Sequence, residues 1–144
     1  MGDSTSQATT ARLFALLVGG LLVLGGIGGF MYESSFGTGD GLASDDIAGT
    51  FSVNGWRNLL YLVSGAAGLA LASRAPRPYA LAVGGLFVLI AVWGWFAVDH
   101  GFGTLADVIP LSGSDNWLHL LIGGAGIAAG LAGRPERART ARAL

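Results

Sequence analysis

The feature that most constrains this chain is the clustering of its charged residues, which leaves four long stretches without a formal charge. These stretches run from Leu13 to Tyr32, Asn58 to Ser73, Pro78 to Val98 and Asn116 to Gly133. A helix needs about 20 consecutive apolar residues to cross the roughly 30 Å of hydrocarbon in a bilayer. The second stretch is short and reaches that length only if its helix extends back through residues 51–57, with Trp56 at the interface and Arg57 extended toward lipid headgroups.

Composition agrees with a membrane protein. The 144 residues are 52% hydrophobic and 12% charged, with no cysteine, and the mean hydropathy is +0.60. The absence of cysteine excludes disulfides and thiolate chemistry. The first stretch is longer than a signal-peptide core and no small-residue cleavage site follows it closely, so it should remain in the mature protein. We predict an all-α membrane protein with a disordered tail (1–12), a four-helix transmembrane domain (13–133) and a basic tail (134–144).

Charge placement predicts the orientation in the membrane. Arginine supplies every positive charge, and seven of the eight residues lie on one side of the proposed topology: Arg12, Arg74, Arg77, Arg134, Arg137, Arg139 and Arg142. By the positive-inside rule that side is cytoplasmic. The opposite loops carry seven of the nine acidic residues, with only Arg57 to offset them. We therefore expect a multi-pass protein of the plasma membrane with both termini in the cytoplasm.

An internal repeat is the strongest pattern in the chain. Residues 18–24 (VGGLLVL) match residues 83–89 (VGGLFVL) at an offset of 65, and residues 58–68 match residues 116–126 at an offset of 58. The second pair fits N-x-x-[HY]-x-x-x-G-x-x-G in both copies. Each copy holds two spans, so both should enter the membrane in the same direction. The predicted repeats cover residues 13–73 and 78–133.

The repeated motif places its defining residues on one face of each helix, because positions i, i+3, i+7 and i+10 fall within an arc of about 80°. The glycines Gly65, Gly68, Gly123 and Gly126 should form helix-packing faces, since close approach favours small residues in lipid. If the two faces meet, they bring together a polar cluster under the outer loops, in a small pocket reached by Arg57, Asp99, His100 or Asp115. The members of this candidate cluster are Asn58, Tyr61, Asn116 and His119.

Each of these polar residues also has a structural interpretation. Asn58 and Asn116 can cap their helices or brace the bundle, and His119 can be a hydrogen-bonded structural residue as well as a functional one. Gly101 and Gly103 imitate part of a dinucleotide fingerprint without the strand it requires. We predict no catalytic residue, no metal site, no cofactor and no nucleic-acid binding.

The second copy, with Asp115, Asn116, Trp117 and His119 followed by Gly123 and Gly126, resembles a family of small prokaryotic four-helix membrane proteins catalogued as a domain of unknown function. The resemblance covers about residues 13–134. The first copy of the family pattern often carries histidine where this chain has Arg57 and Tyr61, so no role that needs histidine from both repeats is implied. The resemblance implies an architecture and no activity, substrate or cofactor.

Three functional hypotheses remain at this stage. The leading one is a non-enzymatic protein with a structural, accessory or partner-binding role, whose partners are the lipid bilayer and either another membrane protein or further copies of the chain. The second is a small transporter or channel component, which needs a polar path that the apolar helices do not supply. The third is a membrane enzyme or carrier for a lipid or quinone-like molecule that uses His119 as acid or base.

Overall fold

The computed structural model describes residues 3–132, which form four helices and two short β-hairpins. The helices are α1 (Asp3–Phe30), α2 (Gly55–Leu71), α3 (Pro76–Ala97) and α4 (Gly113–Leu131). Strand β1 (Asp45–Ile47) pairs antiparallel with β2 (Phe51–Val53), and β3 (Phe102–Leu105) pairs antiparallel with β4 (Ile109–Ser112). A 3-10 turn, η1 (Gly39–Gly41), precedes β1. The predicted helical class is confirmed, and the two small sheets were not predicted.

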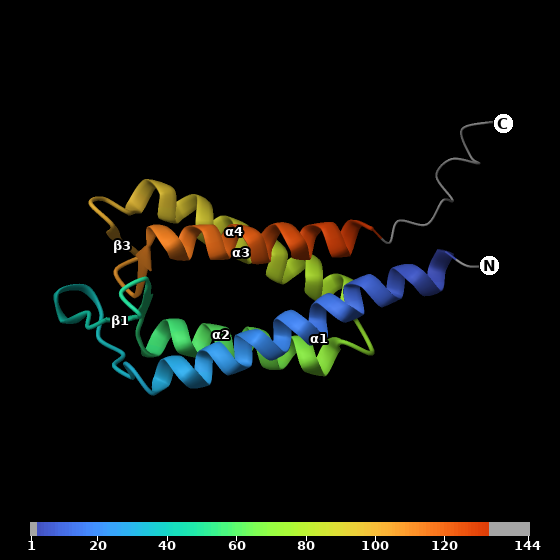
Figure 1. The fold of residues 1–144 in the computed structure, drawn as a ribbon, viewed down its shortest axis with the longest axis horizontal. Helices are drawn as coiled ribbons and strands as arrows, with labels where there is room; N and C mark the ends of the chain where they lie inside the picture. The colour runs from blue at the N-terminus through green and yellow to red at the C-terminus, as the bar shows by residue number, and fades with distance from the viewer. Residues whose placement is uncertain (1–2, 133–144) are drawn as a thin grey trace.

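The helices pack as two pairs (Figure 1). Helix α1 lies along α2, and α3 lies along α4. Both hairpins lie at one end of the molecule, whereas the start of α1 and the end of α4 lie at the other end. The two pairs meet mainly through α1, which contacts both α3 and α4. The buried apolar core formed there includes Phe14, Ala15, Tyr79, Ala80 and Phe87.

Two of the four helices are long and apolar enough to cross a membrane. These segments are Thr10–Phe30 of α1 and Pro76–Ala97 of α3. Helix α2, with 17 residues, is shorter than a typical span. Helix α1 begins at Asp3, so it takes in residues 3–12, which were assigned from the sequence to an N-terminal tail. Once the long apolar segment is helical, extending it toward the N-terminus needs no new nucleation. The predicted basic tail lies outside the described residues.

The start of α2 differs from the prediction. Residues 51–53 form strand β2 rather than an extension of the helix, and α2 begins at Gly55 with Asn54 as its N-cap. The side-chain oxygen of Asn54 accepts a hydrogen bond from the Arg57 amide at 2.9 Å. Arg57 is only 4% exposed and points into the protein, so its predicted extension toward lipid headgroups is wrong. The physical reason is that the guanidinium pairs with the buried carboxylate of Asp115.

The motif glycines allow α2 and α4 to pack closely against neighbouring helices. A Cβ on Gly65 would lie 2.5 Å from the Gly19 carbonyl oxygen of α1, and a Cβ on Gly123 would lie 2.7 Å from the Val88 nitrogen of α3. Gly68 and Gly126 lie closest to Tyr79 and Ala80 respectively, so both approach α3. The glycine faces of α2 and α4 were expected to meet each other. They do not meet, because each faces a different neighbour.

Candidate functional site

Four buried side chains link α2 to α4 just inside the hairpins. Arg57 donates from Nη2 to Asp115 Oδ1 at 2.6 Å and to the Tyr61 hydroxyl at 3.1 Å. The Tyr61 hydroxyl lies 2.8 Å from His119 Nε2. None of the four is more than 7% exposed. We call Arg57, Tyr61, Asp115 and His119 the inter-helix network.

Hydrogen bonding gives the inter-helix network a direction. A guanidinium can only donate, so the Tyr61 hydroxyl accepts from Arg57 and has its own hydrogen free for His119 Nε2. In this direction His119 Nε2 accepts, which corresponds to the neutral tautomer with its hydrogen on Nδ1. Within the described residues, His119 Nδ1 and Arg57 Nε are buried without a hydrogen-bond partner. The Arg57 guanidinium also lies 4.7 Å from the centroid of the Tyr61 ring, which adds a cation–π contact.

Asp115 is both a counter-ion and a helix cap. Its Oδ1 accepts from Arg57, while its Oδ2 accepts from the backbone amides of Ser52 at 3.2 Å and Ser112 at 2.9 Å. The Ser112 hydroxyl in turn accepts from the Asp115 amide, which completes a capping box at the start of α4. A buried carboxylate is stable only when its oxygens are paired and hydrogen-bonded. Asp115 meets this condition with groups from both halves of the chain.

The two β-hairpins are bonded to each other above the inter-helix network. Asn54 Nδ2 donates to the Val108 carbonyl at 2.7 Å, and Ser112 Oγ donates to the Thr50 carbonyl at 2.8 Å. The Gly39 amide donates to the Asp107 carbonyl at 2.8 Å. Together with the Ser52–Asp115 bond, these contacts close one end of the molecule. They also fix the distance between the starts of α2 and α4.

The predicted polar cluster is assembled only in part. Tyr61 and His119 meet, but Asn58 and Asn116 do not join them. Asn58 lies against Gly29 of α1 and donates to the Glu33 carbonyl at 2.8 Å, while Asn116 lies against Gly94 of α3. Neither asparagine is an N-cap, because Asn54 and Ser112 hold those positions. Each asparagine therefore braces its own helix pair.

Helical geometry explains this separation. Residues three apart differ by about 60° around a helix, whereas residues seven apart are nearly aligned. Asn58 and Gly65 accordingly face α1, while Tyr61 is turned toward α4. The face expected to be a single surface is divided between two neighbours. The Tyr61 and His119 rings also pack on Phe87 of α3, at centroid distances of 5.8 and 5.3 Å.

The other residues named from the sequence divide into two groups. Arg57 and Asp115 are members of the inter-helix network. Asp99 and His100 instead pair with each other at the surface, where their side chains are 87% and 93% exposed respectively. Sequence reasoning did not single out the direct pairing of Arg57 with Asp115. A signal existed: the two residues occupy equivalent positions at the offset of 58 and carry opposite charges.

The chemistry of the inter-helix network is that of a neutralised, internally bonded cluster. Its one cation and one carboxylate are paired, and its tyrosine and histidine bond to each other. Among the described residues, no group of three or more His, Cys, Asp or Glu side chains could hold a metal ion. The side chains contact one another, rather than surrounding the small polar pocket that the sequence predicted.

Comparison with known proteins gives a family and no activity. No curated protein and no solved structure matches the chain. Residues 12–132 match a family described as Domain of unknown function (DUF4383). This match covers most of the chain and nearly all of the described residues, including every helix that contributes to the inter-helix network. The chain therefore belongs to the DUF4383 family.

Proposed function

We propose that this protein is a four-span integral membrane protein with a structural, accessory or partner-binding role and no catalytic activity of its own. The observation that carries the proposal is the exposure of large aliphatic side chains along the helices. Leu17, Leu21 and Leu24 of α1 are 64 to 68% exposed, and Leu89 of α3 is 69% exposed. Apolar surface of this kind costs roughly 25 cal/mol per Å² in water and nothing comparable in lipid.

Aromatic residues support a bilayer boundary at the hairpin end. All four tryptophans, Trp56, Trp93, Trp95 and Trp117, lie in the helix turns nearest the hairpins, and each is at least 36% exposed. Tryptophan concentrates at membrane–water interfaces because its ring is amphipathic. The hairpins then lie at the membrane–water interface, where their polar backbone can be solvated and their apolar side chains can contact lipid.

Basic residues support the orientation. Arg12 and Arg74 are exposed near the end opposite the hairpins, and Arg77 donates from Nε to the Gly130 carbonyl there at 2.9 Å. This end is cytoplasmic under the positive-inside rule, so both termini face the cytoplasm and the hairpins face outward. Short α2 and α4 span by extending their apolar length with the flanking interfacial residues.

Equivalent contacts in the two halves support a tandem repeat. The Gly19–Gly65 contact of the first pair corresponds to the Gly84–Gly123 contact of the second, and the Asn58–Gly29 contact corresponds to Asn116–Gly94. The N-caps Asn54 and Ser112 also correspond at the offset of 58. The hydrogen bonds from Arg57 to Asp115 and between Tyr61 and His119 each join residues 58 apart. Equivalent positions of the two copies therefore contact each other. This pattern is typical of residues beside a pseudo-two-fold axis.

A structural role fits the inter-helix network better than catalysis does. Arg57 and Asp115 neutralise each other, and the Tyr61 hydroxyl is engaged by both Arg57 and His119. A substrate would have to displace these contacts and pay for an unpaired buried charge. The network instead ties the two helix pairs together beneath the bonded hairpins. No contact among the described residues specifically supports the transporter or the enzyme hypothesis.

Cysteine labelling from outside intact cells tests the topology, because the chain has no native cysteine. Single substitutions Asp45→Cys and Asp107→Cys should react with a membrane-impermeant maleimide, and Ser73→Cys should react only after lysis. All three positions are exposed. Labelling of the two hairpins from opposite faces, or recovery of the chain in the soluble fraction without detergent, would refute the proposal.

The non-catalytic role has its own test. His119→Ala should lower the stability of the purified protein and reduce co-purification of any membrane partner in mild detergent, because it removes the Tyr61 contact. Tyr79→Phe, a buried change outside the network that removes the 3.0 Å bond to the Ser64 carbonyl, serves as the matched control. A stable His119→Ala protein that has lost a lipid-modifying reaction of the wild type would contradict the proposed role.

A further inference from the structure

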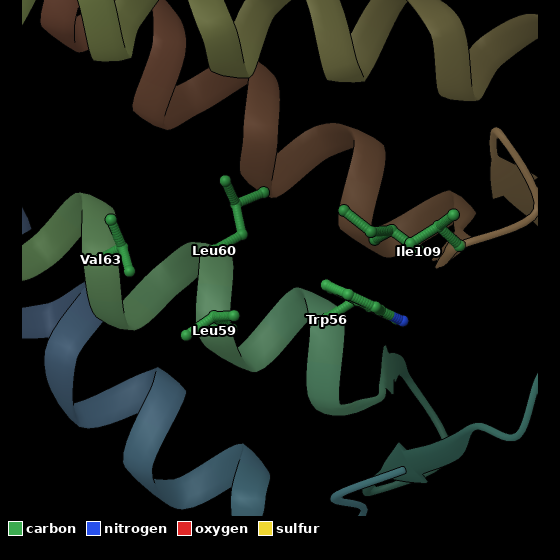
Figure 2. A pocket seen from close by; sticks show the side chains of 6 residues that line it. Trp56, Leu59, Leu60, Val63 and Ile109 are labelled. Atoms are coloured by element: carbon green, nitrogen blue, oxygen red, sulfur yellow. The ribbon is translucent and has the colours of Figure 1, made fainter. Parts of the chain in front are cut away.

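An apolar groove opens beside the inter-helix network, between α2 and the second hairpin (Figure 2). Trp56, Leu59, Leu60 and Val63 line it from α2, and Val108 and Ile109 line it from the other half of the chain. Its volume is about 320 Å³. From this groove we infer a binding site for one acyl chain of a membrane phospholipid, an inference that rests on the proposed membrane location.

The chemistry of the lining selects the occupant. Five of the six lining side chains are aliphatic. The sixth, Trp56, has its indole nitrogen bonded to the Phe36 carbonyl at 3.0 Å, so the groove offers no free side-chain donor or acceptor. A sugar, nucleotide or extended peptide would lose its hydrogen bonds to water without replacement. A hydrocarbon chain loses none.

The size of the groove favours a narrow occupant. At about 320 Å³ it is near the lower limit of small-molecule sites. A helix of a second copy has a diameter of about 10–12 Å with its side chains and would need a longer, wider surface. One stretch of acyl chain fits: Trp56 and Val63 are seven residues apart, which corresponds to about 10 Å along a helix axis.

The position of the groove is continuous with the proposed lipid-facing surface. Leu59 and Val63, on its rim, are 38% and 59% exposed. Trp56 lies at the level of the other tryptophans, so the groove descends from the interfacial zone into the hydrocarbon zone. An acyl chain seated there contacts both halves of the protein where α2 and α4 are joined mainly by polar side chains. The lipid thus adds apolar contact across that junction.

Quenching of single tryptophans by brominated acyl chains tests the inference. One variant retains only Trp56 (Trp93→Phe, Trp95→Phe, Trp117→Phe), and the control retains only Trp117, which is 61% exposed and does not line this groove. Both are reconstituted in phosphatidylcholine vesicles brominated near the headgroup end of the chain and then diluted into detergent. We expect both to be quenched in vesicles, with Trp56 quenching persisting to a detergent excess about tenfold higher.

A groove-filling change completes the test. Val63→Phe, at a largely exposed position that tolerates a larger side chain, should abolish the persistent quenching of Trp56, whereas Leu121→Phe on α4 should not. Loss of quenching for both tryptophans over the same detergent range would overturn the inference. Quenching of Trp117 but not of Trp56 in vesicles would also overturn it and point to a protein segment in the groove. Absence of quenching at both would instead refute the membrane location.

Discussion

The Arg57–Asp115 pair provides the sharpest test of how the two halves are held together. In Arg57→Met the Asp115 carboxylate stays buried, at 0% exposure, with hydrogen-bond donors but no cation. In Asp115→Asn the guanidinium stays buried against the Ser52 carbonyl and the Tyr61 hydroxyl. Removing one partner of a buried pair costs about 3–5 kcal/mol. Each single variant should therefore lose a large part of a typical stability of about 5–15 kcal/mol.

The double variant Arg57→Met/Asp115→Asn distinguishes an unpaired charge from lost packing. It leaves no buried charge, and it loses only hydrogen bonds that contribute about 1 kcal/mol each. We expect it to be less destabilised than either single variant. The free energy of unfolding is measured in mixed micelles with increasing denaturing detergent, followed by tryptophan fluorescence.

Arg74→Met, at an exposed position away from the network, is the matched control and should change the unfolding free energy by less than about 0.5 kcal/mol. Additive losses, with the double variant as unstable as the sum of the two singles, would refute the reasoning, because they would mean that the two charges do not depend on each other.

Three further predictions follow from the packing and the caps. Gly65→Ala and Gly123→Ala should each cost about 1–3 kcal/mol of unfolding free energy, because their Cβ atoms would meet opposing backbone. Gly20→Ala and Gly124→Ala are the controls and should be near neutral, because a Cβ there meets nothing. Equal costs at all four positions would contradict the packing. Tyr61→Phe should cost about 1–3 kcal/mol, because His119 Nε2 loses its partner; an unchanged unfolding midpoint would show that the bond does not contribute. Ser112→Ala should lower the free energy of unfolding by about 0.5–2 kcal/mol and speed amide hydrogen exchange in the first turn of α4. Unchanged exchange at the Asp115 amide would show that Ser112 does not cap the helix.

The sequence predicted the helices well because their signal is local. Uncharged apolar stretches mark most of α1 and α3, and the repeated motif marks α2 and α4. The hairpins were missed because their turns lack the usual Asn-Gly signature. Ala48 and Gly49 have positive φ in the first turn, and Ala106 and Asp107 have positive φ in the second. Three of these four residues are not glycine, so the bonds between the hairpins, rather than local preference, hold these conformations.

The candidate site could be predicted only as far as helical periodicity reaches. The period placed Tyr61 and His119 on the motif face, and they do meet. It could not show that Asn58 and Asn116 turn toward glycine notches on α1 and α3. That depends on the rotation of each helix within its pair. Arg57 was placed at the lipid surface because a lone cation in a short span has no visible partner until Asp115 is brought to it.

The double duty of Asp115 has a consequence for biosynthesis. Arg57 leaves the ribosome 58 residues before its counter-ion, which at about 5–20 residues per second is a delay of roughly 3 to 12 seconds. Through that interval Arg57 of the first helix pair has no carboxylate partner. If the proposed membrane location holds, we expect the first helix pair to insert stably only after α4 has brought Asp115 to Arg57.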